Sequence, residues 1–246
     1  MDSLTIAAAS GLRSRMESLS LLANNLANAA TSGYKSDREF YGLYTSIEAA
    51  PGEEGVLTTL PVVQRQWTDF SQGTVETTGN VLDVALSGRG FLTAKGPGGP
   101  AYTRNGNLHI SPSGELVTSE GFPLFAVGGS TIRVTGGTPV EITKDGTVIQ
   151  EGRTLGQFAI VDFKSTAELE KMNGTCFRNP DPENAPVAAA NVEVQQGRLE
   201  SSNVGVPDAA IRLVGVMRQF EMLHKAVSIG VDLNRKAIEE IARVSA

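Results

Sequence analysis

The chain has 246 residues, of which 40% are hydrophobic and 20% charged, and this is an ordinary composition for a globular protein. Its formal net charge of −6 argues against a large basic surface for nucleic acid. The single cysteine, Cys176, excludes an intramolecular disulfide and is expected to be a small buried hydrophobe.

The first predicted element is a helix within residues 1–33. Small and apolar residues follow one another at alternating steps of three and four, which is the heptad spacing of a coiled-coil stripe. Gly33 is suited to stop the helix in a left-handed conformation. Arg13 and Glu17 interrupt the apolar start too soon for a cleaved secretory signal. The stripe comprises Ala9, Leu12, Met16, Leu19, Ala23, Leu26 and Ala30.

Residues 34–70 are predicted to be a connecting segment, irregular at first and with an exposed loop at 49–55. Residues 71–195 then alternate short β-branched runs with turn sequences such as Asn105-Gly106, a pattern typical of an antiparallel sandwich or open barrel. Strands are expected at 81–87, 90–94, 101–104, 107–110, 115–118, 131–134, 140–143, 147–149 and 157–163.

A linker at 196–206 precedes a second helix, predicted over 207–246 with Pro207 in its first turn. At 1.5 Å per residue this helix would span roughly 55 Å, too long for the N-terminal helix alone to cover. Neighbouring subunits are therefore expected to cover the rest. Its stripe comprises Ala210, Leu213, Met217, Phe220, His224, Val227, Val231, Asn234, Ile238 and Ile241.

No catalytic, metal or cofactor site is predicted. His109 and His224 are far apart in sequence and have no nearby Cys or acidic cluster. The glycine-rich turns lack the Lys-Ser/Thr and the following helix of a phosphate loop. Glu200 and Asp208 could be imagined as paired carboxylates, but a solvated location is expected for both. No apolar run reaches the length of a membrane span.

Three stretches resemble the flagellar rod and hook family of axial proteins. The first is Ala23–Lys35, which contains the run Asn24-Asn25-Leu26-Ala27-Asn28. The second begins at Gln72 and continues through Phe91 to the Tyr102–Asn107 segment. The third is Gln196–Val204, followed by the C-terminal helix. Their order and placement along the chain carry the resemblance.

The resemblance implies a structural subunit of the flagellar rod. Its expected fold class is α+β, with long N- and C-terminal helices forming a coiled-coil inner layer and a central β-rich antiparallel domain facing outward. Such proteins pass unfolded through the flagellar export apparatus and assemble in the periplasm into a hollow shaft. The implied partners are other copies of the chain and other rod proteins, without cofactor, nucleic acid or membrane insertion.

Several features favour a proximal-rod member over a distal-rod or hook-type one. They are the Arg218–Met222 sequence, the Leu82–Leu86 and Tyr102–Asn107 segments, and the short stretch between Tyr34 and Gln72. Of the other classes of protein, an enzyme is disfavoured because no catalytic set is present. A secreted β-domain binding module is disfavoured because it has no need of heptad stripes at both termini.

The residues expected to pack subunits together lie in the two helices. Asparagine is a poor residue for a helix interior. The asparagines near the end of the first helix therefore either end it or bond to a neighbouring subunit, and the resemblance favours the second role. The terminal segments are expected to be partly disordered until they dock. The residues are Leu12, Leu19, Asn24, Asn25, Leu26, Asn28, Leu213, Met217, Phe220, Val227, Val231, Ile238 and Ile241.

Overall fold

The computed structural model describes residues 3–45, 59–172 and 174–244. Its fold is α+β with antiparallel sheets, as the sequence predicted. The chain divides into two compact units. Unit 1 comprises Met1–Ala27, Asp37–Trp67 and Gly205–Ala246, and unit 2 comprises Asn28–Ser36 and Thr68–Val204. Both terminal helices belong to unit 1.

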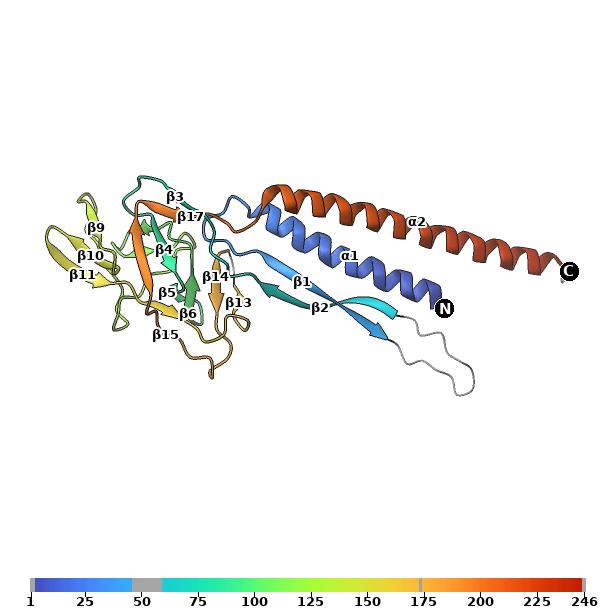
Figure 1. Ribbon diagram of the computed structural model, residues 1–246, viewed down its shortest axis with the longest axis horizontal. Helices are drawn as coiled ribbons and strands as arrows, with labels where there is room; N and C mark the ends of the chain where they lie inside the picture. Colours follow the sequence, from blue (N-terminus) through green and yellow to red (C-terminus); the bar gives the residue numbers. More distant parts are fainter. Residues whose placement is uncertain (1–2, 46–58, 173, 245–246) are drawn as a thin grey trace. The chain divides into compact units, whose positions relative to one another are not determined.

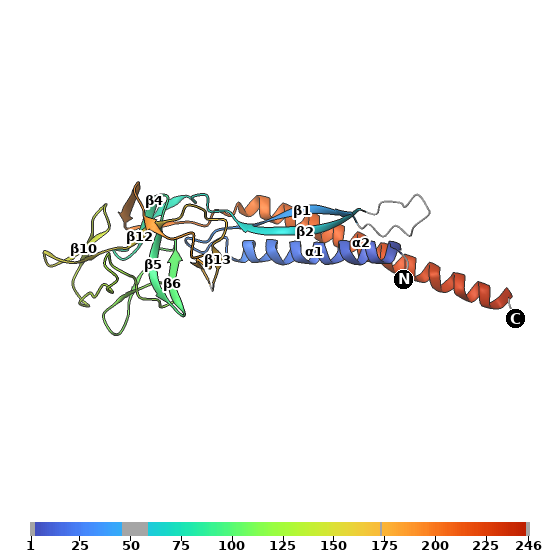
Figure 2. The ribbon, with the colours of Figure 1, turned by 90° about the horizontal axis from the view of Figure 1, so that it is seen from below.

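Unit 1 contains α1 (Ser3–Ala27), β1 (Asp37–Thr45), most of β2 (Thr59–Thr68) and α2 (Val206–Val244). The two helices run antiparallel alongside each other, and the β1–β2 sheet lies along α1 (Figures 1 and 2). Because α2 has 39 residues and α1 only 25, the C-terminal part of α2 extends beyond α1 (Figure 1).

The buried face of α1 differs from the predicted stripe. A methyl group added at Gly11 would lie 3.7 Å from Leu223 Cδ1 of α2, so the two helices approach closely there. Small side chains permit this approach, because the distance between two helix axes depends on the residues at the contact. Met16, a member of the predicted stripe, is instead 59% exposed. Within residues 10–27 of α1, where burial is described, the buried residues are Gly11, Ser14, Ser18, Leu21 and Asn25.

The most covered side of α2 also follows heptad spacing, but only part of the predicted stripe lies on it. Met217 and Val231 are 47% and 55% exposed. The helix begins at Val206, close to the predicted start, whereas α1 ends at Ala27, before the predicted stop at Gly33. The buried and half-buried residues on this side are Ala209, Leu213, Val216, Phe220, Leu223, Val227 and Gly230.

Unit 2 is built from short antiparallel strands. The largest sheet has six strands in the order β13 (Glu170–Lys171), β14 (Cys176–Arg178), β6 (Gly99–Thr103), β5 (Phe91–Gly96), β12 (Ile160–Asp162) and β15 (Val187–Ala188). A second sheet has the order β11 (Arg153–Gln157), β10 (Thr147–Gln150), β9 (Val140–Ile142). Three further pairs are β16 (Val192–Gln196) with β4 (Val84–Gly88), β17 (Arg198–Glu200) with β3 (Val75–Thr77), and β7 (His109–Ile110) with β8 (Leu116–Val117).

The predicted strands from β4 to β10 largely coincide with the observed ones, but several elements were not predicted. β1 and β2 lie in the predicted connecting segment, β3 and most of β11 fall outside the predicted strands, and β13 to β17 gave no signal, whereas the strand predicted at 157–163 contains β12. The strand predicted at 131–134 is limited to isolated bridges, such as Glu115 with Arg133. β13, β14, β15 and β17 have only two or three residues, too few for a detectable alternation, whereas β1 has nine and β16 has five. The loop predicted at 49–55 lies outside the described residues.

Two hydrophobic cores hold unit 2 together. The larger is aliphatic and includes Leu86, Leu116 and Ile132, each at most 1% exposed. The smaller is aromatic: Tyr102 and Phe163 make an edge contact with ring centroids 4.8 Å apart, and Phe177 is completely buried. The packing of these cores fixes the positions of the strands that carry the polar groups described below.

Replacing Phe177 by alanine is expected to lower the free energy of unfolding by about 3–5 kcal/mol, because it leaves a cavity in the aromatic core. Chemical denaturation measures this change. The control Val127→Ala alters a residue that is 65% exposed and should change stability by less than about 0.5 kcal/mol. Equal effects of the two variants would contradict the assignment of the core.

Candidate functional site

The segment that follows α1 and the segment that precedes α2 meet inside unit 2. We name this meeting point the terminal junction; it comprises residues 33–36, 69–73 and 198–203. Gly33 N donates to Glu200 O at 2.7 Å, and Asp69 N donates to Ser36 O at 2.8 Å. Gly33 has the predicted positive φ, of 68°, and a Cβ there would lie 2.4 Å from Asn105 N. Glycine is therefore required by close backbone approach as well as by conformation.

The side chain of Asn203 bonds to two segments of the terminal junction at once. Its Oδ1 accepts from Ser36 N at 2.8 Å, and its Nδ2 donates to Asp69 O at 2.7 Å and to Ser71 O at 3.2 Å. An asparagine amide has both a donor and an acceptor, so it can satisfy backbone groups on two sides. Asn203 thus links the 33–36 segment to the 69–73 segment through its side chain.

A buried cluster of three charged side chains lies at the centre of the junction. Lys35 Nζ is 2.5 Å from Glu200 Oε1, and Arg104 Nε is 3.4 Å from Glu200 Oε2. The side chains of Lys35 and Glu200 are 0% exposed and that of Arg104 is 5% exposed. Lys35 Nζ also donates to Ser71 O at 2.7 Å, and Gly73 N donates to Glu200 Oε1 at 2.9 Å.

The cluster is only partly compensated for its loss of water. Burial lowers the pKa of Lys35 even though Glu200 acts to raise it, and burial likewise lowers the pKa of Arg104. Within the described part of the chain, Glu200 Oε2 and Arg104 Nη1 find no hydrogen-bond partner. A buried ion pair of this kind need not stabilise a fold, but removing one partner leaves a buried charge unpaired.

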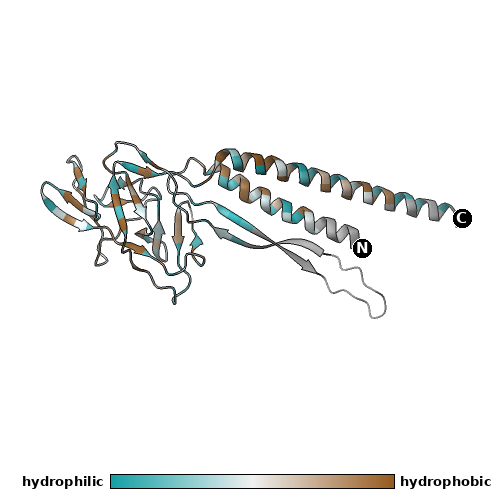
Figure 3. Cartoon of the chain, in the orientation of Figure 1, coloured by the Kyte–Doolittle hydropathy of each residue, from teal (hydrophilic) through white to brown (hydrophobic). Residues whose placement is uncertain are grey.

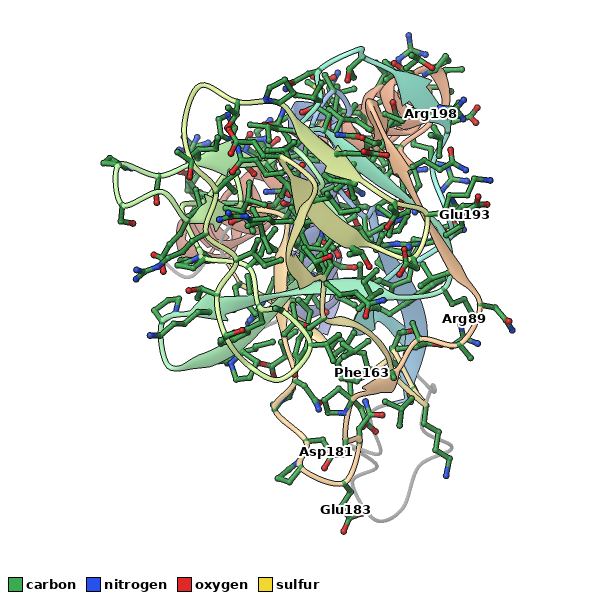
Figure 4. All side chains as sticks on the ribbon, turned by 90° about the vertical axis from the view of Figure 1, so that its left-hand side faces the viewer. Arg89, Phe163, Asp181, Glu183, Glu193 and Arg198 are labelled. Atoms are coloured by element: carbon green, nitrogen blue, oxygen red, sulfur yellow. The ribbon has the colours of Figure 1, made fainter. Side chains whose placement is uncertain are left out.

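The expectation that Glu200 is solvated is therefore wrong. Its main partner, Lys35, is 165 positions away in the chain, so no local pattern could reveal the contact. Three other charged side chains of unit 2 are surface groups: Arg89, Glu193 and Arg198 point outward in Figure 4. The only signal available from sequence was the Glu200 position inside the third family-like stretch.

The predicted asparagines make contacts within the chain. Asn25 is 5% exposed; its Nδ2 donates to Asp37 O at 2.7 Å and its Oδ1 accepts from Asp37 N at 2.9 Å, so the amide pairs with the start of β1 as a neighbouring strand would. Asn28 Oδ1 accepts from Thr31 Oγ1 at 3.3 Å in the turn after α1. Asn24 is exposed.

The apolar residues predicted for assembly fall into three groups. Leu12, Leu19, Leu26, Leu213, Phe220 and Val227 are half-buried within unit 1. Met217 and Val231 are exposed. The side chains of Ile238 and Ile241 lie outside those that the structure describes.

A second apolar stripe on α2 was not predicted from the sequence. Its residues lie on one side of the helix, opposite the most covered side, because they are separated by nearly whole numbers of turns. The apolar colour recurs along α2 in Figure 3. We name this set the outer stripe; it comprises Ile211, Met222, Ile229 and Leu233, which are 71%, 64%, 51% and 62% exposed.

Among the described residues, no three His, Cys, Asp or Glu side chains gather in a way that could hold a metal ion. Neither described helix is long and apolar enough to cross a membrane. The structure thus combines a β-rich unit, in which the segments next to the two helices are joined, with a helix pair that leaves apolar side chains of α2 exposed.

Comparisons with known proteins identify the class. Residues 85–150 match the model of the flagellar hook protein FlgE/F/G D1 domain, and residues 195–240 match that of the flagellar basal body rod FlgEFG protein C-terminal region. The chain is 31% identical over 232 residues to the flagellar basal-body rod protein FlgF of Caulobacter vibrioides, covering 92% of this chain and 93% of that one.

Two further relatives agree. The FlgF of Salmonella typhimurium is 28% identical over 261 residues, with 100% of both chains covered. The rod protein FlgG of Bacillus subtilis is 28% identical over 251 residues, with 93% and 95% covered. The chain belongs to the flagellar basal-body rod protein family, FlgF/FlgG, and is a structural rod subunit of the bacterial flagellum. This confirms the resemblance read from the sequence.

Cys176 is expected to be unreactive in the folded protein. Burial, with a smaller contribution from Glu120, raises the pKa of its thiol from 9.0 to about 12. The folded state therefore holds the proton more tightly than the unfolded state, and folding loses stability as the pH rises above 9 towards 12. Thiol labelling at pH 9 should proceed only through unfolding, whereas the chain in guanidinium should react at once. Rapid labelling of the native protein would contradict the burial.

Proposed function

We propose that the chain is the proximal-rod member of the family, the FlgF type, rather than the distal-rod FlgG type or a hook-type protein. FlgF and FlgG relatives have similar identities to this chain, such as 31% for the Caulobacter FlgF and 30% for the Borreliella FlgG. The choice is therefore supported by the Arg218–Met222 sequence and by the short stretch between Tyr34 and Gln72. In this proposal the chain forms the part of the rod nearest the cell interior.

We also propose that α1 and α2 form the coiled-coil inner layer of a hollow shaft in the periplasm. The observation that supports this best is the outer stripe of α2, which nothing in the chain covers among the described residues. Exposed apolar residues in a row favour association. The C-terminal part of α2, which extends beyond α1, has the same need for a neighbour.

The geometry of the two helices favours an open assembly over a closed dimer. Met16 on α1 and the outer stripe on α2 are different surfaces of the same unit. When two different patches of one protein bind each other between copies, the contact repeats and produces a ring or an open helical array. A helical tube requires a contact of this kind. The half-buried leucines of α1 widen its patch around Met16.

The proposed partners are other copies of this chain and other proximal- and distal-rod subunits. Family membership implies assembly with rod proteins, and the export apparatus is proposed as the route without a cleaved signal. The role is structural, with no catalysis, cofactor, nucleic acid or membrane insertion. Asn24 and Asn28 remain proposed contacts to a neighbouring subunit, together with the apolar residues of both helices, Ile238 and Ile241 included.

Replacing Met222 and Ile229 together by lysine is expected to abolish swimming. Each buried apolar side chain contributes about 1.5–3 kcal/mol, and the loss recurs at every copy in the rod. Helicity of the purified chain should not change, because both residues are exposed in the single subunit. Gln219→Lys combined with Ser228→Lys adds the same two charges at exposed polar positions of α2 and should swim normally. Normal swimming of the double variant would remove the stripe from the interface.

Deleting the gene is expected to abolish motility and leave cells without filaments, since the filament is built on the rod. A complementing chain with a surface epitope in unit 2 should be labelled at the cell-proximal end of the rod in isolated basal bodies. Label at the distal end would instead support the FlgG type. A deletion strain with normal flagella would contradict the rod function in that organism.

A further inference from the structure

The cluster of Lys35, Glu200 and Arg104 brings together residues from the two ends of unit 2. Lys35 lies just before β1, where the chain leaves unit 2, and Glu200 ends β17, shortly before α2. Arg104 follows β6, in the middle of the chain. No two of these residues belong to the same strand pair, so the cluster is a separate connection, in addition to the backbone bonds of the terminal junction.

The three charges depend on one another. Among the described ion pairs, Glu200 is the only carboxylate in contact with Lys35 or Arg104. Asp69 and Asp162 act on these two cations only by weaker electrostatic attraction, Asp69 on Lys35 and Asp162 on Arg104. If 198–203 left, Lys35 and Arg104 would face each other without Glu200. If 33–36 left, Glu200 would keep Arg104 and Gly73 N but lose its closest partner.

The backbone segments of the terminal junction lie too close together to rearrange easily when one of them leaves. A Cβ at Gly73 would lie 2.0 Å from Ser201 O, so the 69–73 segment touches the 198–203 segment directly. Asn203 bonds both to Ser36 and to Asp69, and Gly33 N bonds to Glu200 O. Displacing one segment therefore breaks bonds of the other as well as uncovering the charges.

We propose that the Lys35–Glu200–Arg104 cluster is a two-ended latch, which holds both terminal segments of unit 2 docked and, when one segment leaves, releases the other. The segments that precede β1 and α2 are then either both anchored or both free. The latch is a property of the single chain, and it stands or fails independently of the proposed place in the rod.

The exposed ion pair of Glu170 with Arg178 provides a matched control in the same unit. Its closest approach is 2.6 Å, but the side chains are 51% and 63% exposed. Pairs of this kind contribute little, because water screens them and solvates either partner when it is alone. Glu170→Gln removes the same charge as Glu200→Gln without leaving a buried cation.

Native-state hydrogen exchange on the full chain tests the latch, with reporters on the side opposite each change. Lys35→Met should lower the protection of the Ser201 amide, which bonds to Thr74 O, by at least about 100-fold. Glu200→Gln should lower the protection of the Asp69 amide, which bonds to Ser36 O, by a similar factor. Glu170→Gln should change either reporter by less than about threefold. A loss confined to the altered segment would overturn the latch.

A double variant keeps the test decisive if a single variant fails to fold. Lys35→Met combined with Glu200→Gln removes both partners of the closest ion pair, so the buried Lys35 cation that Glu200→Gln alone would leave is absent, while Arg104 keeps its bond to Gly88 O. The latch predicts that the double variant is protected at both reporters more than the product of the single effects allows, or that it folds where a single variant does not. Multiplicative effects, or a double variant less folded than both singles, would overturn the proposal.

Discussion

The buried carboxylate of Glu200 constrains more of this structure than any other single group. This carboxylate can be buried away from water only because Lys35, Arg104 and Gly73 N contact it from three separate parts of the chain. Their convergence brings the 33–36 and 198–203 segments side by side within unit 2. The chain enters unit 1 directly after the first of these segments, and α2 follows the second.

The two units differ in how much they can bury by themselves. Unit 2 contains an aliphatic and an aromatic core, with residues such as Leu116 and Phe177 fully covered. In unit 1 the buried face of α1 is made mainly of small and polar side chains, and Leu21 is its only large buried hydrophobe among the residues with described burial. Exposed Ile211 and Met222 on α2 extend the contrast. Unit 1 therefore buries less of its apolar side-chain surface within the chain than unit 2 does.

Two asparagine side chains bond to backbone groups that have no regular strand or helix partner there. Asn25 bonds to the backbone N–H and C=O of Asp37, and Asn203 bonds to the backbone N–H of Ser36 and the backbone C=O of Asp69. A buried backbone group without a partner is costly, so an asparagine is useful where a helix or an irregular turn meets a strand end. This gives Asn25 a reason to occur in a helix, separate from any contact between subunits.

The sequence by itself determined the α+β class, the two terminal helices, many of the strands from β4 to β10 and the flagellar family. Local periodicity, turn residues and contiguous motifs such as Asn24–Lys35 indicate these features. Only the tertiary structure decided which faces of α1 and α2 are covered, because two overlapping heptad stripes fit the same helix. It also decided that Glu200 is buried. A charge is buried or solvated according to its partners, and those of Glu200 lie far away in the chain.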